Sequence, residues 1–167
     1  ARVGGLVGQI FGSSGGVYQS YSEANITGDK GLGGLVGKLD RGGRINDSYA
    51  RGNVTSLAGS TNTRCGGLVG DFYDGTITNS FSTGDVRCGT YSGGFCGRCL
   101  GTVTKSFYDL ENVSITSCTG GFCNNPLGNI PLSWYSLIDV DYMITQEWDF
   151  TNIWYTGNDD TFYPILN

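Results

Sequence analysis

A short glycine-rich motif recurs along this chain and limits the folds that are open to it. A Gly-Gly pair followed by two apolar residues begins at residues 4, 33, 66, 93 and 120, so successive copies lie 29, 33, 27 and 27 residues apart. Such a period is typical of repeat proteins, in which each unit buries its apolar side chains against its neighbours. The 29 glycines among 167 residues also disfavour helices, because a glycine inside a helix costs about 1 kcal/mol relative to alanine.

Two further segments recur in fixed order inside the first four units. A serine precedes an aromatic residue at Ser20-Tyr21, Ser48-Tyr49, Ser80-Phe81 and Ser106-Phe107. An Asn or Asp then precedes Ile or Val at Asn25-Ile26, Asn53-Val54, Asp85-Val86 and Asn112-Val113. All three segments are short, rich in strand-forming residues and bounded by turn residues, which predicts three strands per unit and leaves no room for a helix. Each strand then pairs in parallel with its counterpart one unit later, so residues 1–124 are expected to form an all-β, right-handed parallel β-helix (β-solenoid) of about four to five rungs.

Stacking of the units predicts ladders of equivalent residues. Three inward ladders are expected: Leu6, Leu35, Leu68, Phe95 and Phe122; Val17, Ile45, Ile77 and Val103; and Ile26, Val54, Val86 and Val113. Strict alternation puts Ile45 and Tyr49 on one face, together with the polar residue between them, Asp47. Either a bend lies between Ile45 and Tyr49 or one ladder faces outward.

The composition changes after residue 124. Residues 125–167 contain no further glycine repeat and are crowded with aromatic residues: Trp134, Tyr135, Tyr142, Trp148, Phe150, Trp154, Tyr155, Phe162 and Tyr163. We expect this stretch to be a C-terminal cap over the end of the solenoid core, within the same structural domain. A glycan-binding platform is the alternative interpretation of the cluster.

Six cysteines lie between residues 65 and 123, and their even number favours disulfides. Cys96 and Cys123 hold the same repeat position in adjacent units, so stacking puts their Cα atoms about 4.8 Å apart, within disulfide range. Proximity completes the predicted set, which is Cys96–Cys123, Cys65–Cys88 and Cys99–Cys118. Zinc is the alternative, but the chain has no histidine and one CxxC pair, which supply too few ligands. No metal or cofactor is therefore predicted.

The repeated segments resemble the GLUG repeat, a motif of large bacterial surface proteins that include adhesins and IgA-cleaving peptidases. The resemblance runs from about residue 3 to residue 124, and the stretch from Met143 to Leu166 looks like the segment that often follows the last such repeat. It implies a parallel β-helix and a surface or secreted setting. It does not imply catalysis, since in those peptidases the chemistry would lie elsewhere in the chain.

Four Asn-X-Ser/Thr sequons are candidate glycosylation sites, at Asn25, Asn46, Asn53 and Asn112. Asn25, Asn53 and Asn112 occupy one repeat position, so the repeat pattern itself generates these sequons. An ordinary polar ladder at a turn is the alternative interpretation.

Charge and composition narrow the function classes. The net charge is -5 and the sequence shows no run of basic residues, so nucleic acid is not an expected partner. No stretch approaches the roughly 20 apolar residues of a membrane span. Glycan cleavage needs a pair of carboxylates, but the candidate acids occupy non-equivalent repeat positions: Asp71, Asp74, Asp85 and Asp109. Ice binding is a second alternative, suggested by Thr76-Ile77-Thr78 and Thr102-Val103-Thr104 on adjacent units.

The leading expectation is a non-enzymatic, extracellular structural or adhesive module with no catalytic, cofactor or metal residues and with glycans as candidate ligands. The first repeat begins at Gly4, so residues 3–30 present an uncovered terminal rung. An uncovered rung exposes strand edges that can pair with another chain. We therefore expect this rung to be covered by preceding domains of a longer polypeptide, or by a second copy packed head to tail, which would build a surface fibre.

Overall fold

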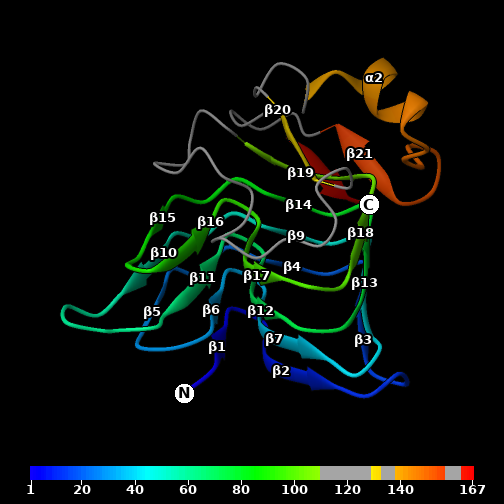
Figure 1. Cartoon of the computed structure of the whole chain (residues 1–167). Helices are drawn as coiled ribbons and strands as arrows, with labels where there is room; N and C mark the ends of the chain where they lie inside the picture. The colour runs from blue at the N-terminus through cyan, green and yellow to red at the C-terminus, as the bar shows by residue number, and fades with distance from the viewer. Residues whose placement is uncertain (110–128, 133–137, 157–162) are drawn as a thin grey trace.

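The computed structural model describes residues 1–109, 138–156 and 163–167, and the backbone of residues 129–132. The chain winds into a parallel β-solenoid, as the repeats predict (Figure 1). The described strands form four coils, which rise from the N-terminus at the bottom of the view, where the ribbon is blue, to the green strands near the top. We number them coils 1 to 4, which comprise β1–β5, β6–β10, β11–β15 and β16–β19.

Equivalent strands of successive coils form five parallel sheets, A to E. Sheet A contains β1 (Val3–Gly4), β6 (Leu32–Gly33), β11 (Arg64–Gly66) and β16 (Tyr91–Gly93). Sheet B contains β2 (Val7–Phe11), β7 (Val36–Asp40), β12 (Val69–Phe72) and β17 (Cys96–Cys99). Sheet C contains β3 (Gly16–Tyr18), β8 (Gly43–Asn46), β13 (Gly75–Thr78) and β18 (Thr102–Thr104). Sheet D contains β4 (Tyr21–Ser22), β9 (Tyr49–Ala50), β14 (Phe81–Ser82), β19 (Ser106–Asp109) and β20 (Asn129–Leu132). Sheet E contains β5 (Ile26–Gly28), β10 (Val54–Ser56) and β15 (Val86–Arg87).

Each coil therefore holds up to five short strands instead of the three expected. One division lies at the Gly-Gly pair, where the chain passes directly from sheet A to sheet B, and another lies at a bend between sheets C and D. A Cβ atom on Gly34 would lie 2.1 Å from the carbonyl oxygen of Gly67, and one on Gly67 would lie 2.2 Å from that of Gly94. Only glycine fits at a position where two backbones approach so closely. The motif is thus a backbone-to-backbone junction between two strands.

The predicted inward ladders are confirmed in the described coils. Val17, Ile45, Ile77 and Val103 stand in register on sheet C, and Ile26, Val54 and Val86 on sheet E. All seven side chains are buried. Leu35, Leu68 and Phe95 are fully buried as well, whereas Leu6, at the same position of coil 1, is 48% exposed because no coil covers it. Phe122 and Val113 lie outside the described residues.

A bend separates the inward ladder of sheet C from the aromatic ladder of sheet D. The residue at the bend has a positive φ in every described coil: Gln19, Asp47, Asn79 and Lys105, with φ between 44° and 50°. A single left-handed residue reverses the alternation of the side chains that follow it. Tyr49, Phe81 and Phe107 consequently point away from the interior that Ile45 fills.

Side chains complete the hydrogen bonding between coils at two turns. The backbone N–H of Ser20 donates to Ser48 Oγ, that of Ser48 to Ser80 Oγ, and that of Ser80 to Ser106 Oγ, each at 3.2 Å. At the other turn, the N–H of Asn53 donates to Asn25 Oδ1, and the N–H of Asp85 donates to Asn53 Oδ1. Both ladders satisfy backbone donors at turns that no strand pairing reaches.

The C-terminal segment consists of helix α2 (Val140–Thr145) and an antiparallel pair, β21 (Trp154–Thr156) with β22 (Pro164–Leu166). Met143, Trp148 and Trp154 form one buried cluster with the aromatic ladder of sheet D, which comprises Tyr49, Phe81 and Phe107. The Trp154 ring lies 5.9 Å from that of Phe81, centroid to centroid. The aromatic cluster exists as expected, but its described part covers the outer face of sheet D along coils 2 to 4. Residues 125–128, 133–137 and 157–162 of the expected cap lie outside the described residues, so a cap over the end of the core stays a prediction.

Two polar contacts fix this segment on the solenoid. Trp148 Nε1 donates to the backbone oxygen of Lys105, and the Arg51 guanidinium donates to the backbone oxygen of Pro164. The Arg51 guanidinium also lies 5.0 Å from the Tyr49 ring centroid and 5.8 Å from that of Tyr163. Among the described residues, no helix is both long enough and apolar enough to cross a bilayer.

Candidate functional site

Two ladders of outward side chains face each other where sheets A and B diverge. One wall consists of the residues at the register position two before the Gly-Gly pair, and the other of residues in the middle of the sheet B strands. The first wall is Arg2, Gly31, Arg64 and Tyr91, and the second is Gln9, Lys38, Asp71 and Arg98. We call the space between them the lateral groove. Both ladders follow the stacking direction of the coils, and part of the space between them is a hollow lined by Arg2, Gly31, Arg64 and Asp71.

Asp71 is the buried acid of the lateral groove. Its side chain is 4% exposed, and it accepts a hydrogen bond from Arg98 Nε at 2.6 Å. Its other oxygen lies 3.8 Å from Arg64, which belongs to the opposite wall. Two arginines therefore balance this carboxylate inside the protein.

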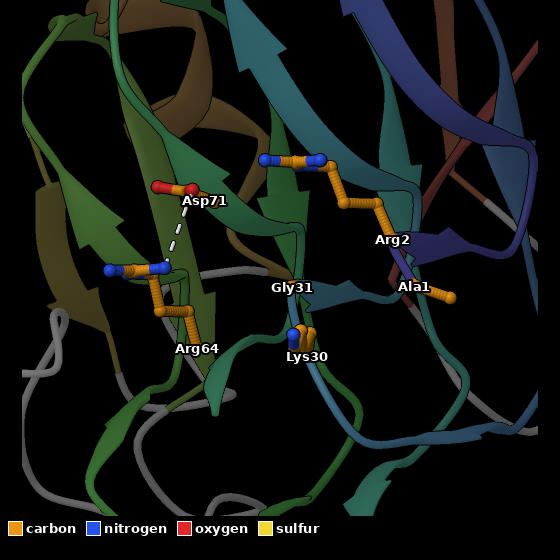
Figure 2. Close-up of a pocket in the computed structure, with 6 residues that line it drawn as sticks. All are labelled: Ala1, Arg2, Lys30, Gly31, Arg64 and Asp71. Carbon is orange, nitrogen blue, oxygen red and sulfur yellow. Dashed lines mark ion pairs between the residues drawn. The ribbon is translucent and has the colours of Figure 1, made fainter. Parts of the chain in front are cut away.

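A hollow of about 250 Å³ opens beside Asp71, lined by Ala1, Arg2, Lys30, Gly31, Arg64 and Asp71. Figure 2 shows Arg2 and Arg64 extending toward Asp71 from two sides, with Lys30 between them. Apart from the backbone amine of Ala1, three cationic side chains and one carboxylate thus line the hollow, and of these cations Arg64 pairs with the carboxylate. Within the described part of the chain, Arg2 and Lys30 form no side-chain hydrogen bond or ion pair.

An aromatic ring lies next to these charges. Tyr73, which follows β12, is 50% exposed, and its ring centroid lies 5.0 Å from the Arg98 guanidinium and 5.7 Å from the Lys38 ammonium. Lys38 also donates to Asp40 at 2.6 Å, and this bond holds the pKa of the Asp40 carboxyl below its usual value. The lateral groove thus combines cations, one half-exposed ring and acids that are already paired.

Arg2, Lys30, Arg64 and Arg98 do not stand out as a group in the sequence, because successive members lie 28, 34 and 34 residues apart. A signal was nonetheless present. Arg2 and Arg64 each stand two residues before a Gly-Gly pair, so alignment of the repeats places them on one ladder.

Three of the four candidate carboxylates for glycan cleavage each have a different side-chain partner. Asp71 pairs with Arg98 and Arg64, Asp85 pairs with Arg87, and Asp109 accepts a hydrogen bond from the Tyr163 hydroxyl. Asp74 is exposed in the turn after β12. Among the described residues, no group of three or more His, Cys, Asp or Glu side chains is placed to hold a metal ion.

The threonine array covers two of the four coils. Thr76 is in register with Thr102, and Thr78 with Thr104. On the coil below, the corresponding positions hold Arg44 and Asn46, and below these lie Gly16 and Tyr18. A flat hydroxyl surface across coils 1 to 4 is therefore not present.

The structure places three of the four candidate glycosylation sites. Asn25 and Asn53 are exposed, although the Oδ1 atom of each accepts a hydrogen bond from the backbone of the next coil. Asn46 is half-buried, and the hydroxyl of its sequon serine, Ser48, is buried and donates to the backbone oxygen of Asn46. Asn112 lies outside the described residues. Glycosylation stays a prediction.

Cys65 and Cys88 form a disulfide, the pairing expected from their proximity. It joins β11 of sheet A to the turn after β15, next to the apolar cluster of Ile26, Leu32, Val54 and Val86. Cys96 and Cys99 are buried in the main core, where Cys96 continues a ladder of valines on sheet B. Their predicted partners, Cys123 and Cys118, lie outside the described residues, so both pairings stay predictions.

The stacked coils and their register define a parallel β-solenoid built from glycine-rich repeats. One of these repeats matches a known family model: residues 28–55 match the model described as "The GLUG motif". These residues run from the end of β5 to β10, so the match comprises essentially the whole of coil 2.

Known proteins contain similar segments. An immunoglobulin A1 protease of Streptococcus pneumoniae is 33% identical over 91 residues, which are 52% of this chain and 4% of that protein. Halomucin of Haloquadratum walsbyi is 38% identical over 111 residues, which are 58% of this chain and 1% of that protein. The chain therefore corresponds to a small part of the relatives that it matches.

A solved structure has the same architecture. The crystal structure of a candidate immunoglobulin A1 protease from Bacteroides ovatus superposes with a TM-score of 0.64, over 96% of this chain and 55% of that one. The two sequences are 19% identical, so this likeness concerns the fold.

Proposed function

We propose that this chain is a non-enzymatic structural module of a larger extracellular protein, in which further coils continue the solenoid below coil 1. The observation that supports this most directly is the exposure of coil 1. Leu6 is 48% and Tyr21 is 52% exposed, whereas the residues at the same ladder positions of coils 2 to 4 are at most 3% exposed. The motif relatives support the proposal too, because each is far longer than this chain.

Physical reasons favour another coil as the cover. The strands of coil 1 pair on one side only, and the unpaired side presents the backbone groups that a parallel strand needs. The Tyr21 ring stacks on that of Tyr49 with centroids 5.0 Å apart, which leaves its other face open for the next aromatic residue of the ladder. A further coil would satisfy both features with the register already established in this chain.

The test is a chain in which residues 1–32 are repeated ahead of Gly4, so that an added coil continues the register. Its control is an extension of equal length made of Gly and Ser. We expect at least tenfold greater amide protection for residues 3–30 with the added coil and no change with the control. Full protection of residues 3–30 in the unextended, monomeric chain would overturn the proposal, because it would show that coil 1 needs no cover.

A head-to-tail fibre of identical chains is the second candidate, and the open coil 1 favours it equally. Light scattering and electron microscopy across a range of concentrations distinguish the two. Filaments that the Tyr21→Ser substitution abolishes would favour the fibre, because this side chain lies on the surface that a second copy would cover.

The absence of catalysis belongs to the same proposal. Its support is that Asp71, Asp85 and Asp109 are each engaged by another side chain. Release of reducing sugar from a panel of polysaccharides, abolished by Asp71→Asn, would overturn it. The ice-binding alternative is tested directly by thermal hysteresis, which an ice-binding protein produces and a purely structural module does not.

A further inference from the structure

We infer that the lateral groove binds an acidic polysaccharide, whose carboxylate or sulfate group enters the hollow beside Asp71. The inference goes beyond the structural role proposed above.

The charges of the hollow determine the sign of the ligand. Arg2, Lys30 and Arg64 line it, and the carboxylate among them, Asp71, already pairs with Arg98 and Arg64. Arg2 and Lys30 retain their donors for an external group, with Asp29 adjacent to Lys30 in sequence. This surplus of positive charge stands out in a chain whose net charge is -5. Arginine forms paired hydrogen bonds with carboxylate and sulfate oxygens, which makes these groups the fitting occupants.

The walls of the lateral groove favour a saccharide over a peptide. An extended peptide binds most readily by pairing with an open strand edge. The strands that carry the central part of the groove, β6, β7, β11 and β12, pair on both sides within sheets A and B, so they offer no such edge. The occupant must instead be held by side chains alone. A sugar, with hydroxyls at its rim and C–H groups on its faces, meets this requirement.

Tyr73 supplies the apolar surface that a sugar ring needs. Its ring is half-exposed and lies close to Arg98 and Lys38, which flank Asp71 on the same wall. An amphipathic ring beside charged groups suits a ligand with apolar faces and a polar rim. Because the walls continue from coil to coil, a linear polymer can lie along the groove with one acidic group in the hollow.

The experiment is calorimetric titration of the whole chain at low and moderate salt with four probes. Oligogalacturonate carries carboxylates, a heparin oligosaccharide adds sulfates, dextran is neutral, and poly-glutamate is an acidic peptide. We expect one or both acidic saccharides to bind, more weakly at higher salt, and dextran and poly-glutamate not to bind. The two acidic saccharides show whether carboxylate or sulfate is preferred.

Matched variants locate the site. Arg2→Gln and Lys30→Gln remove exposed side chains that form no hydrogen bond or ion pair with the described residues, so both should fold normally. Each should weaken binding roughly tenfold, the typical effect of one lost charged hydrogen bond. Arg44→Gln removes the same charge from sheet C and should leave binding unchanged. Equal affinity of Arg2→Gln, Arg44→Gln and the unmodified chain would overturn the assignment. So would binding of poly-glutamate as tight as that of the saccharides, or no binding by either acidic saccharide.

Discussion

The serine ladder between the coils should stabilise the fold far more in the middle of the stack than at coil 1. Ser80 is fully buried, and its Oγ accepts the backbone N–H of Ser48 while donating to the backbone oxygen of Thr78. Ser80→Ala removes both hydrogen bonds. The Thr78 oxygen keeps a second donor, the N–H of Asp47, but the N–H of Ser48 is left buried without this acceptor.

The expected loss of stability follows from these contacts. A buried donor left unsatisfied costs about 1–3 kcal/mol, and the lost bond to Thr78 adds about 0.5–1.5 kcal/mol. Ser80→Ala should therefore lower the free energy of unfolding by about 1.5–4.5 kcal/mol. Ser20 is the matched control, because within the described residues its hydroxyl makes one hydrogen bond, to the exposed backbone oxygen of Tyr18. Water can replace that bond, so Ser20→Ala should cost about 0.5 kcal/mol.

Urea unfolding followed by far-UV circular dichroism and by tryptophan fluorescence measures both values. The two probes should give coincident transitions for each variant, so that a single free energy applies. Equal losses for Ser80→Ala and Ser20→Ala would refute the reasoning, because the hydrogen bonds between the middle coils would then contribute no more than an exposed one.

Three further predictions concern a close backbone contact, a titrating acid and the disulfide. Gly67→Ala should prevent folding or cost more than about 3 kcal/mol, because its Cβ would lie 2.2 Å from a backbone oxygen of the next coil. Gly89→Ala is the control, because the nearest atom to its Cβ would be 3.7 Å away. This variant should change stability by less than about 0.5 kcal/mol in the same unfolding assay. Burial raises the pKa of Asp47 above its ordinary value of 3.8, so its ionisation destabilises the fold as pH rises through that range. Asp47→Asn should therefore raise the midpoint of thermal unfolding at pH 7 and not at pH 3; a gain of equal size at both pH values would show that the charge has no part in it. The cysteines of the Cys65–Cys88 disulfide are 23 residues apart in the chain, so its reduction should lower the free energy of unfolding by about 3 kcal/mol. Mass mapping of unreduced peptides should recover the linked pair. Free thiols at both positions would contradict the structure.

Most of the architecture was predictable from the repeats, for a specific reason. Once the Gly-Gly pairs are aligned, every later position in a unit has a defined neighbour above and below, and the ladders of Ile45 and Val54 follow without further information. The choice between a bend and an outward ladder at Tyr49 did not follow, because it depends on the conformation of one residue. The positive φ of Asp47 decides between the two. Gln19 and Lys105 adopt the same conformation, although glutamine and lysine are not residue types that predict a positive φ.

The sequence likewise did not determine which surface the described C-terminal residues cover. Its aromatic residues predict burial against an apolar surface, and two such surfaces were available, the end of the core and the outer face of sheet D. The second exists because the bend turns Tyr49, Phe81 and Phe107 outward, which leaves a row of rings that Trp148 and Trp154 cover.

The sequence by itself thus determined the stack, since a regular glycine period forces equivalent segments into register and each unit needs its neighbours to bury apolar side chains. The tertiary structure decided which surfaces the stack creates. Arg2 belongs to coil 1, and Arg64 and Asp71 to two different strands of coil 3, yet all three line one hollow because sheets A and B diverge beside the Gly-Gly junction. The direction in which each ladder faces depends on backbone angles at single residues, and these angles become fixed only when the coils pack.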